Sequence, residues 1–423
     1  MADPTAKVAM NAVCSMPIGK VALNRRRVGE VEHSYSVHLP ENKATAQNNS
    51  GRCWMFAGLN CLRYEATKRM ELGDDFELSQ VYTLFWDKLE KANYFLQSIE
   101  DTLSEPDGSR LLDFLLVQPL QDGGQWHMLV SLIKKYGLVP KAVMPETESS
   151  SNTGAMTAHM TSVLRDAACR MRSSERSQVS VIRHEALETC YRILTVHLGQ
   201  PPVEFDWQWR DKEKAFHPTE RLTPKTFYDK YIGVNLDEYA CLIHDPRPKH
   251  QFGRTYTVSF LGNVVGGDPI CYLNVDLRLF RQAAINQLQA GEPVWFGCDV
   301  GKHLERDLGV LDLDIFELES IYGRMPTFNK AERLTYGQSL MTHAMVFTGV
   351  DLDHNGQAKK WRVENSWSDK PGDKGFFLMT DPWFEQYMYE VVVHQRHLAT
   401  ELLSKLKEDP IGLDPWDPMG SLA

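Results

Sequence analysis

The 423-residue chain lacks long apolar runs, closely spaced cysteine pairs and an excess of basic charge. No stretch reaches the roughly 18 apolar residues that a membrane-spanning helix needs, and residues 1–4 do not begin a secretory signal. The eight cysteines are scattered without a CxxC pair, which predicts neither a disulfide framework nor a zinc site. We therefore expect a cytoplasmic protein with no membrane association and no metal or other cofactor.

Phosphate-binding loops are missing as well. Gly123 and Gly124 are surrounded by neither GxxxxGK[ST] nor GxGxxG, so they do not indicate a nucleotide site. With 43% hydrophobic and 24% charged residues, the chain can bury a substantial core. This composition is consistent with a large soluble enzyme.

The most informative segment present is residues 47–54, where Gln47 stands six residues before Cys53. This spacing suits a thiolate nucleophile beside an oxyanion donor. Free N–H groups at a helix start would lower the thiol pKa, although a lone cysteine is more often a small buried apolar residue. We expect Ser50 and Gly51 to cap the helix that begins near Cys53. Apolar residues recur along this helix in steps of four and three, at Met55, Leu59, Leu62, Ala66 and Met70.

A second informative segment lies far downstream, at residues 339–350, which have the length and composition of a strand. Residues 361–367 form a second expected strand, joined to the first through turn-prone residues 351–356. There Asn365 could accept a hydrogen bond from the His343 imidazole while Trp367 excludes water. Taken singly, His343 is more often a core residue and Asn365 an ordinary strand-end residue. We expect one face of the first strand to carry Met341, His343, Met345 and Phe347.

Gln47, Cys53, His343 and Asn365 are the parts of a Cys-His-Asn hydrolase in their expected order. The surrounding motifs resemble the papain-like cysteine peptidases, specifically the bleomycin hydrolase and aminopeptidase C family. This resemblance covers nearly the whole chain and implies that Cys53 is the nucleophile, His343 the general base and then acid, Asn365 its orienter and Gln47 an oxyanion donor. The motifs are Ser-Gly-Arg-Cys-Trp, Asp-Gly-Gly-Gln-Trp, Leu-Met-Thr-His-Ala-Met, Trp-Arg-Val-Glu-Asn-Ser-Trp and the final Pro-Trp-Asp-Pro-Met-Gly.

The resemblance implies an α+β fold, in which a papain-like core of a helical half and an antiparallel β half carries large, mainly helical insertions. Cys53 and His343 are 290 residues apart, whereas papain-type enzymes place the pair roughly 130–150 apart. The expected units are a first core part with the nucleophile helix at 1–75, a hook-like helical insertion at 76–120, a core segment at 121–145, a second helical insertion at 146–250, the β half with His343 and Asn365 at 251–405, and a tail at 406–423.

The tail contains three prolines from residue 410 onward, which favour an extended path. Composition alone would predict a mobile terminus. The resemblance instead places the tail in the active-site cleft, where the carboxylate of Ala423 meets the free α-amine of the substrate. It also implies that Gly123 and Gly124 bind an extended substrate through bare backbone. With Trp367, these residues form the expected substrate-binding set.

We accordingly predict a cysteine aminopeptidase that removes N-terminal residues from peptides with broad specificity and also hydrolyses the amide of bleomycin-like compounds. The resemblance further implies a homohexameric ring. Only 52 residues precede Cys53, too few for a signal and pro-segment. The alternative is a nucleic-acid or other binding protein on a peptidase scaffold. The basic cluster at residues 25–27 favours this alternative, whereas the net charge of −10 counts against it. Ser368 stands where the family commonly has glycine, so a positive φ there would strain it.

Overall fold

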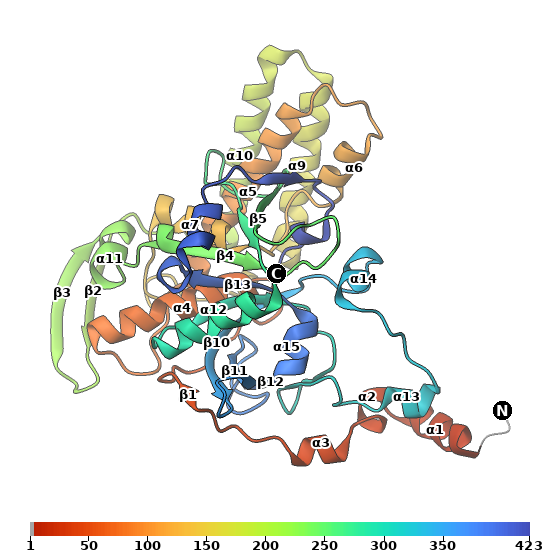
Figure 1. The fold of residues 1–423 in the computed structure, drawn as a ribbon. Coiled ribbons are helices and arrows are strands. Elements are labelled where there is room, and N and C mark those ends of the chain that lie inside the picture. The colour runs from red at the N-terminus through yellow and green to blue at the C-terminus, as the bar shows by residue number, and fades with distance from the viewer. Residues whose placement is uncertain (1–3) are drawn as a thin grey trace.

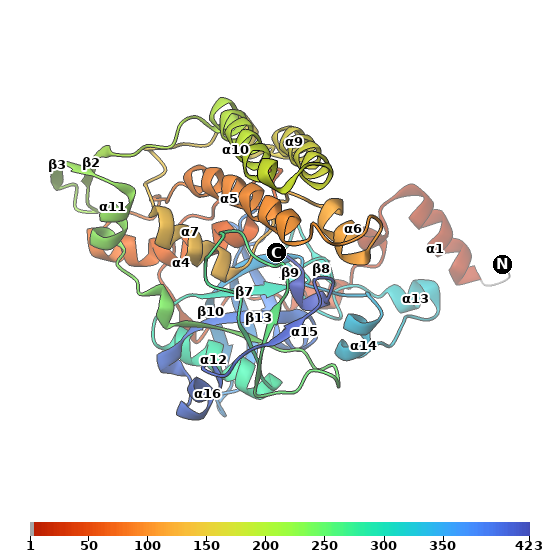
Figure 2. The same cartoon turned by 90° about the horizontal axis from the view of Figure 1, so that it is seen from above.

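The computed structural model describes residues 4–423, in which a helical part and a large sheet meet along one central helix (Figure 1). The expected absence of a secretory signal at residues 1–4 falls mostly on residues 1–3, which lie outside the described range. Within residues 4–423, no helix is both long and apolar enough to span a membrane. Both Figure 1 and Figure 2 place the C-terminus in the middle of the view, between these two parts.

The sheet contains twelve of the strands found in residues 4–423. Its middle is antiparallel, as expected, whereas the pairs β4–β6, β5–β14 and β9–β12 are parallel. A short strand, β1 (Val37–His38), pairs with β10 off the main path. In spatial order the other strands are β14 (Ile411–Leu413), β5 (Arg254–Val258), β6 (Tyr272–Asn274), β4 (Tyr239–Ile243), β13 (Met388–His394), β7 (Val294–Cys298), β10 (His343–Leu352), β11 (Ala358–Glu364), β12 (Phe376–Thr380), β9 (Val310–Leu311) and β8 (Leu304–Glu305).

The central helix is α4 (Cys53–Met70), which begins at the residue that the apolar periodicity predicts. The five apolar residues of the expected stripe are all buried, which confirms that prediction. The first three turns are buried on their other faces too, as Trp54, Phe56 and Asn60 show. The reason is that α4 lies between the sheet and the helical part, so only its last turns reach the surface.

Two hydrophobic cores flank the sheet. Alternate strand residues contribute to each, so Trp295 and Val346 belong to the core shared with α4 and α7 (Trp126–Tyr136). Their neighbours Phe296 and Phe347 belong to the opposite core. The second core is covered by α12 (Leu277–Gln289) and α15 (Asp381–Tyr387). The sheet is therefore buried on both faces, which fixes the position of each strand relative to α4.

The helical part lies above α4 and contains three long helices packed side by side (Figure 2). The first long helix lies within the expected helical insertion at 76–120, and the other two, which are separated near Ser174, lie within the expected insertion at 146–250. Ser79 is the N-cap of the first long helix, α5 (Gln80–Asp101), because its side chain accepts a hydrogen bond from the Tyr82 N–H. The other helices of this part are α6 (Arg110–Val117), α8 (Glu148–Ser151), α9 (Gly154–Ser173) and α10 (Arg176–Leu198).

Residues 146–250 also contain strands, which the expectation of a mainly helical insertion did not include. β2 (Phe205–Arg210) and β3 (Phe216–Leu222) form a separate hairpin that projects on the left of Figure 1. Its Trp207 and Trp209 rings stack with centroids 6.1 Å apart. β4 lies in the same stretch but belongs to the main sheet. The segment between the hairpin and β4 holds α11 (Pro224–Tyr231) and η1 (Leu236–Glu238).

β10 and β11 form the expected antiparallel hairpin, with Val346 opposite Glu364. The expected strands were too long at one end each, since β10 begins only at His343 and β11 ends at Glu364. The expectation that Met341 shares a face with Met345 and Phe347 is wrong. Met341 precedes the strand and packs instead over Gly297 on the α4 side.

The remaining elements lie around this framework. At Ser368 the backbone has a φ of 71°, so serine occupies a left-handed conformation that costs about 1–2 kcal/mol. An amino-terminal arm extends to the lower right of Figure 1. The arm and the other short helices are α1 (Pro4–Ser15), α2 (Ile18–Val21), α3 (Arg25–Gly29), α13 (Leu318–Tyr322), α14 (Lys330–Thr335), η2 (Gln395–His397), α16 (Thr400–Lys405) and η3 (Pro418–Gly420).

Candidate active site

Cys53 is the first residue of α4 and is buried. The N-cap is Arg52 rather than Ser50 or Gly51, and it makes no side-chain cap bond. The Ser50 hydroxyl instead donates to the Gln47 carbonyl at 2.6 Å. The expected capping role was therefore wrong, and no side chain occupies the first-turn N–H groups as a cap. The N–H groups of Cys53 and Trp54 act instead on the Cys53 sulfur and lower the pKa of its thiol.

Gln47 is held by both ends of its side-chain amide. The Ser366 hydroxyl donates to Oε1 at 2.6 Å, and Nε2 donates to the Ser50 carbonyl at 2.6 Å. The Gln47 backbone N–H also donates to the Ser366 carbonyl at 2.8 Å. Because an amide nitrogen carries two N–H groups, the second remains for a further acceptor. Gln47 is thus an oriented donor close to the start of α4.

His343 and Asn365 form the contact expected from their strands. Asn365 Oδ1 lies 2.9 Å from His343 Nε2 and accepts its hydrogen bond. This bond assigns the proton to Nε2 and leaves Nδ1 as the acceptor nitrogen of the neutral ring. The Trp367 ring covers the imidazole, with ring centroids 4.9 Å apart. The structure thus places Trp367 against the imidazole that bonds Asn365.

The thiol of Cys53 lies beside the start of β10. The Ala344 N–H, one residue beyond His343, hydrogen-bonds the sulfur and lowers the thiol pKa. Burial has the larger effect, and it raises the pKa of Cys53 to about 11. Burial also lowers the pKa of His343 to about 4. The expectation of a lowered thiol pKa is not met at this buried site, because loss of water outweighs the helix start.

Supporting residues that the sequence did not single out fix the entry to α4. Arg52 is fully buried and forms a bidentate pair with Glu146, at 3.1 and 3.0 Å. Asp122 accepts from the Gly51 N–H at 3.0 Å and pairs with Lys88 at 2.5 Å. Asp122 directly precedes Gly123 and Gly124, so the Asp-Gly-Gly motif could have indicated its supporting role. The bonds join the start of α4 to the glycine segment.

That glycine segment is paired with the chain's own C-terminus. The Gly124 N–H donates to the Ala423 carboxyl-terminal oxygen at 3.2 Å, and the Ala423 N–H donates to the Gly124 carbonyl at 3.3 Å. The Gln125 amide donates to the Ser421 carbonyl at 2.7 Å. A side chain at Gly123 would meet Leu422 at 2.8 Å, so only glycine fits there. The tail and both expected glycines therefore come together beside α4.

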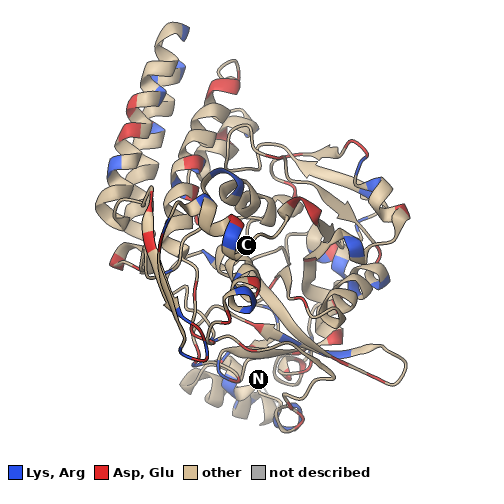
Figure 3. Ribbon diagram, turned by 90° about the vertical axis from the view of Figure 1, so that its left-hand side faces the viewer, with Lys and Arg blue, Asp and Glu red and all other residues tan. Residues whose placement is uncertain are grey.

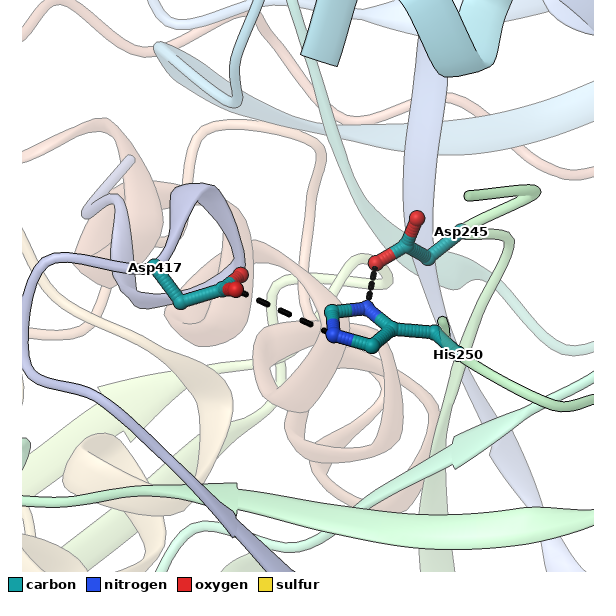
Figure 4. A group of neighbouring side chains, drawn as sticks. All are labelled: Asp245, His250 and Asp417. Carbon is teal, nitrogen blue, oxygen red and sulfur yellow. Dashed lines mark hydrogen bonds and ion pairs between the residues drawn. The ribbon is translucent and has the colours of Figure 1, made fainter. Parts of the chain in front are cut away.

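Another group of side chains could in principle hold a metal ion. Asp245, His250 and Asp417 place ligand atoms within 4.8 Å of one another (Figure 4). Arg247 already donates to both carboxylates, at 2.7 and 2.6 Å. The guanidinium thus supplies the cation that two buried carboxylates require. The group is an ion-pair cluster.

Comparison with known proteins identifies the family. A family model described as "Peptidase C1-like family" matches residues 1–420. The chain belongs to this family. A crystal structure of PepW from Lactobacillus rhamnosis HN001 superposes with a TM-score of 0.97 at 45% identity, covering 100% of this chain and 96% of that one.

Two named relatives match almost the full chain. Aminopeptidase C of Listeria monocytogenes serovar 1/2a is 44% identical over 419 residues, which cover 99% of this chain and 93% of the relative. Bleomycin hydrolase of Homo sapiens is 39% identical over 435 residues, covering 100% and 95%. The predicted family and the α+β, papain-like fold class are confirmed. The names of these relatives support the predicted enzyme class, a cysteine-type aminopeptidase.

Proposed function

We propose that this member of the Peptidase C1-like family removes N-terminal residues from peptides by a Cys-His-Asn mechanism. The observation that carries the proposal is the buried His343–Asn365 hydrogen bond of 2.9 Å, formed where the Ala344 N–H meets the Cys53 sulfur. It is the arrangement that a thiol nucleophile and its oriented base require.

In the proposed reaction, His343 Nδ1 takes the thiol proton of Cys53 as the sulfur attacks the scissile carbonyl carbon. The resulting oxyanion accepts hydrogen bonds from the Gln47 amide and the Cys53 N–H. The imidazolium then gives its proton to the leaving amine as the C–N bond breaks, which leaves a thioester. Water hydrolyses the thioester with His343 again as base, and the thiol is restored.

Proton transfer from Cys53 to His343 is consistent with the raised pKa of the thiol and the lowered pKa of the imidazole. Burial disfavours a lone thiolate and a lone imidazolium, so the resting groups are a neutral thiol and a neutral imidazole. Proton transfer between them creates opposite charges together, and these charges stabilise each other in a site that excludes water. Asn365 stabilises the imidazolium because its carbonyl oxygen accepts the Nε2–H bond.

The C-terminal tail gives the proposed enzyme its exopeptidase character. Its last residue pairs with Gly124 through both backbone groups, in the way that an extended peptide would. The Ala423 carboxylate would attract a substrate's free α-ammonium, while the tail blocks the path of a longer chain. Removal of an N-terminal residue is then favoured over internal cleavage.

Deletion of residues 421–423 tests this role. We expect the truncated enzyme to lose about tenfold in kcat/KM for free aminoacyl amides, because a buried charge pair is lost. It should also begin to cleave peptides whose amino groups are acetylated. Peptide mapping by mass spectrometry would measure both changes, and unchanged rejection of acetylated peptides would contradict the role.

The substrate range is proposed to be broad and to include the amide of bleomycin-like compounds, since the human relative is named a bleomycin hydrolase. Fluorogenic aminoacyl amides, offered free and acetylated, test the reaction and its polarity together. Preferred hydrolysis of the free forms supports an aminopeptidase. Equal rates on both forms would mean that the free amine is not recognised.

The nucleic-acid alternative is less favoured. In the basic cluster at 25–27, Arg27 is already paired with Asp312 and Glu30, at 2.5 and 2.7 Å. Figure 3 shows basic and acidic residues mixed along the helices and loops. Such mixing does not give the continuous basic surface that nucleic-acid backbones require.

A homohexamer in the cytoplasm is proposed as the working form. Exposed apolar side chains on α1 and α10, including Val8 and Val196, offer surface for contacts between chains. A reducing compartment would keep the Cys53 thiol active. Sedimentation should give a particle of six 48.3 kDa chains, whereas a monomer of 48.3 kDa would contradict the hexamer.

A further inference from the structure

The C-terminal tail is fixed to the body before it reaches Gly124. Asp417, six residues from the end, is buried, and its carboxylate accepts from the Met419 N–H at 3.0 Å. This bond caps η3, the short helical turn that directs the last three residues toward Gly124. The position of Asp417 therefore influences where Ala423 lies.

The partners of Asp417 come from the segment that follows β4. Arg247 Nη2 donates to Asp417 Oδ1 at 2.6 Å and to Asp245 Oδ2 at 2.7 Å. The Arg247 Nε also donates to Asp245, and His250 Nδ1 donates to the same carboxylate. Lys249, which is largely exposed, reaches Asp417 at 3.3 Å. Figure 4 shows the carboxylates on opposite sides of the His250 ring.

Asp245 fixes the orientation of Arg247 independently of the tail. The Asp245 carboxylate accepts hydrogen bonds from both Nε and Nη2 of Arg247. Nη2 also donates to Asp417. All three side chains are buried, which makes the contact a charge-assisted bond in a low-dielectric site. Loss of the Asp417 charge would still leave Arg247 paired with Asp245. A substitution at Asp417 should consequently affect the tail and spare the body.

We propose that the Asp417–Arg247 pair is the anchor that positions the Ala423 carboxylate, and that Asp417 and Arg247 are positioning residues for recognition of the substrate's free amine. This inference rests on the proposed function of the tail. Beyond the anchor, Ser421 donates to the Met341 carbonyl at 2.6 Å and accepts from Gln125. These bonds hold residues 421–423 locally, whereas Asp417 fixes the segment between β14, which pairs with β5, and those last residues.

The test compares Asp417→Asn with wild type on a free aminoacyl fluorogenic amide and its acetylated form. We expect KM for the free amide to rise about tenfold, the effect of one lost charge-assisted bond, while kcat changes less than about threefold. Relative cleavage of the acetylated form should rise. The rate of Cys53 alkylation by iodoacetamide should not fall, because the thiol and its base remain in place.

Glu408→Gln is the matched control. Glu408 lies in the same tail and pairs with Lys405 at 2.8 Å, but that pair is exposed to solvent. Its loss should leave KM unchanged. Deletion of residues 421–423, measured in parallel, separates the anchor from the proposed function. If the deletion changes selectivity and Asp417→Asn does not, the anchor is refuted and the role of the tail stands. If the deletion does not change selectivity, the proposed role of the tail is refuted, and the anchor is refuted with it.

A second variant covers the case in which Asp417→Asn does not fold. Asp417→Ser retains a hydroxyl that can cap η3 but cannot pair with Arg247, and we expect the same rise in KM. Unfolding of both variants would overturn the proposal, because an anchor confined to the tail leaves the Tm of the body nearly unchanged.

Discussion

Cys53→Ala is expected to abolish hydrolysis of free aminoacyl amides, with kcat falling at least ~10⁴-fold. Without the sulfur no thioester can form, and His343 has no thiol proton to accept. The fold should persist, because alanine keeps the Cβ packing at the start of α4. Initial rates with a fluorogenic aminoacyl amide, together with circular dichroism, would measure both expectations.

The matched control for this substitution is Cys61→Ala on the same helix. Cys61 is partly buried two turns further along α4. Activity should be retained in Cys61→Ala, because it is Cys53, at the helix start, whose sulfur meets the Ala344 N–H beside His343. If Cys53→Ala kept a comparable rate, the nucleophile would have to be another group and the proposed mechanism would be wrong.

Gln47→Ala is expected to lower kcat by about 10²–10³-fold, the usual loss when one oxyanion-hole donor is removed. KM should change little, because the amide acts on a charge that develops only in the transition state. Steady-state kinetics on the same amide would separate the two parameters. Alkylation of Cys53 should proceed at nearly the wild-type rate, since that reaction forms no oxyanion.

Ser366→Ala provides a graded comparison. It removes the hydroxyl that donates to Gln47 Oε1 at 2.6 Å but keeps the amide, so its loss in kcat should be smaller than that of Gln47→Ala. Equal losses in both variants would indicate that Gln47 acts through local structure. A kcat within about twofold of wild type in Gln47→Ala would exclude an oxyanion role.

Local periodicity predicted the elements that carry the candidate site. The three- and four-residue steps after Cys53 were sufficient to predict α4, and Asp353 and Gly356 marked the turn of the β10–β11 hairpin. The β2–β3 hairpin was missed although Phe205, Trp207 and Trp209 alternate with polar residues. The expectation of a single, mainly helical insertion at 146–250 covered that stretch as well.

Contacts between distant residues could not be read from periodicity. The Arg52–Glu146 pair joins residues 94 positions apart, and nothing in either local pattern marks a buried charge. For the same reason Ser50 looked like a better cap than Arg52. The types of Gln47, Cys53, His343 and Asn365 could be predicted, because a Cys-His-Asn mechanism requires those groups, whereas their order along the chain came from the family resemblance.

The thiol pKa shows why local reasoning was insufficient. A helix start favours the thiolate, and that effect depends only on neighbouring N–H groups. Burial of the Cys53 thiol depends on the tail and the sheet, whose residues are far from Cys53 in the sequence. In the complete fold the second effect is larger, so the charge state at Cys53 is set by what covers it.

The helical insertion also touches the tail at Trp416. The Arg110 guanidinium lies 3.8 Å from the Trp416 ring centroid, and Phe114 meets the same ring edge-on at 6.2 Å. Both residues belong to α6, at some distance along the chain from the catalytic groups. With the tail in its proposed role, substitutions on this one helix would change which peptide ends are accepted and leave the catalytic groups in place.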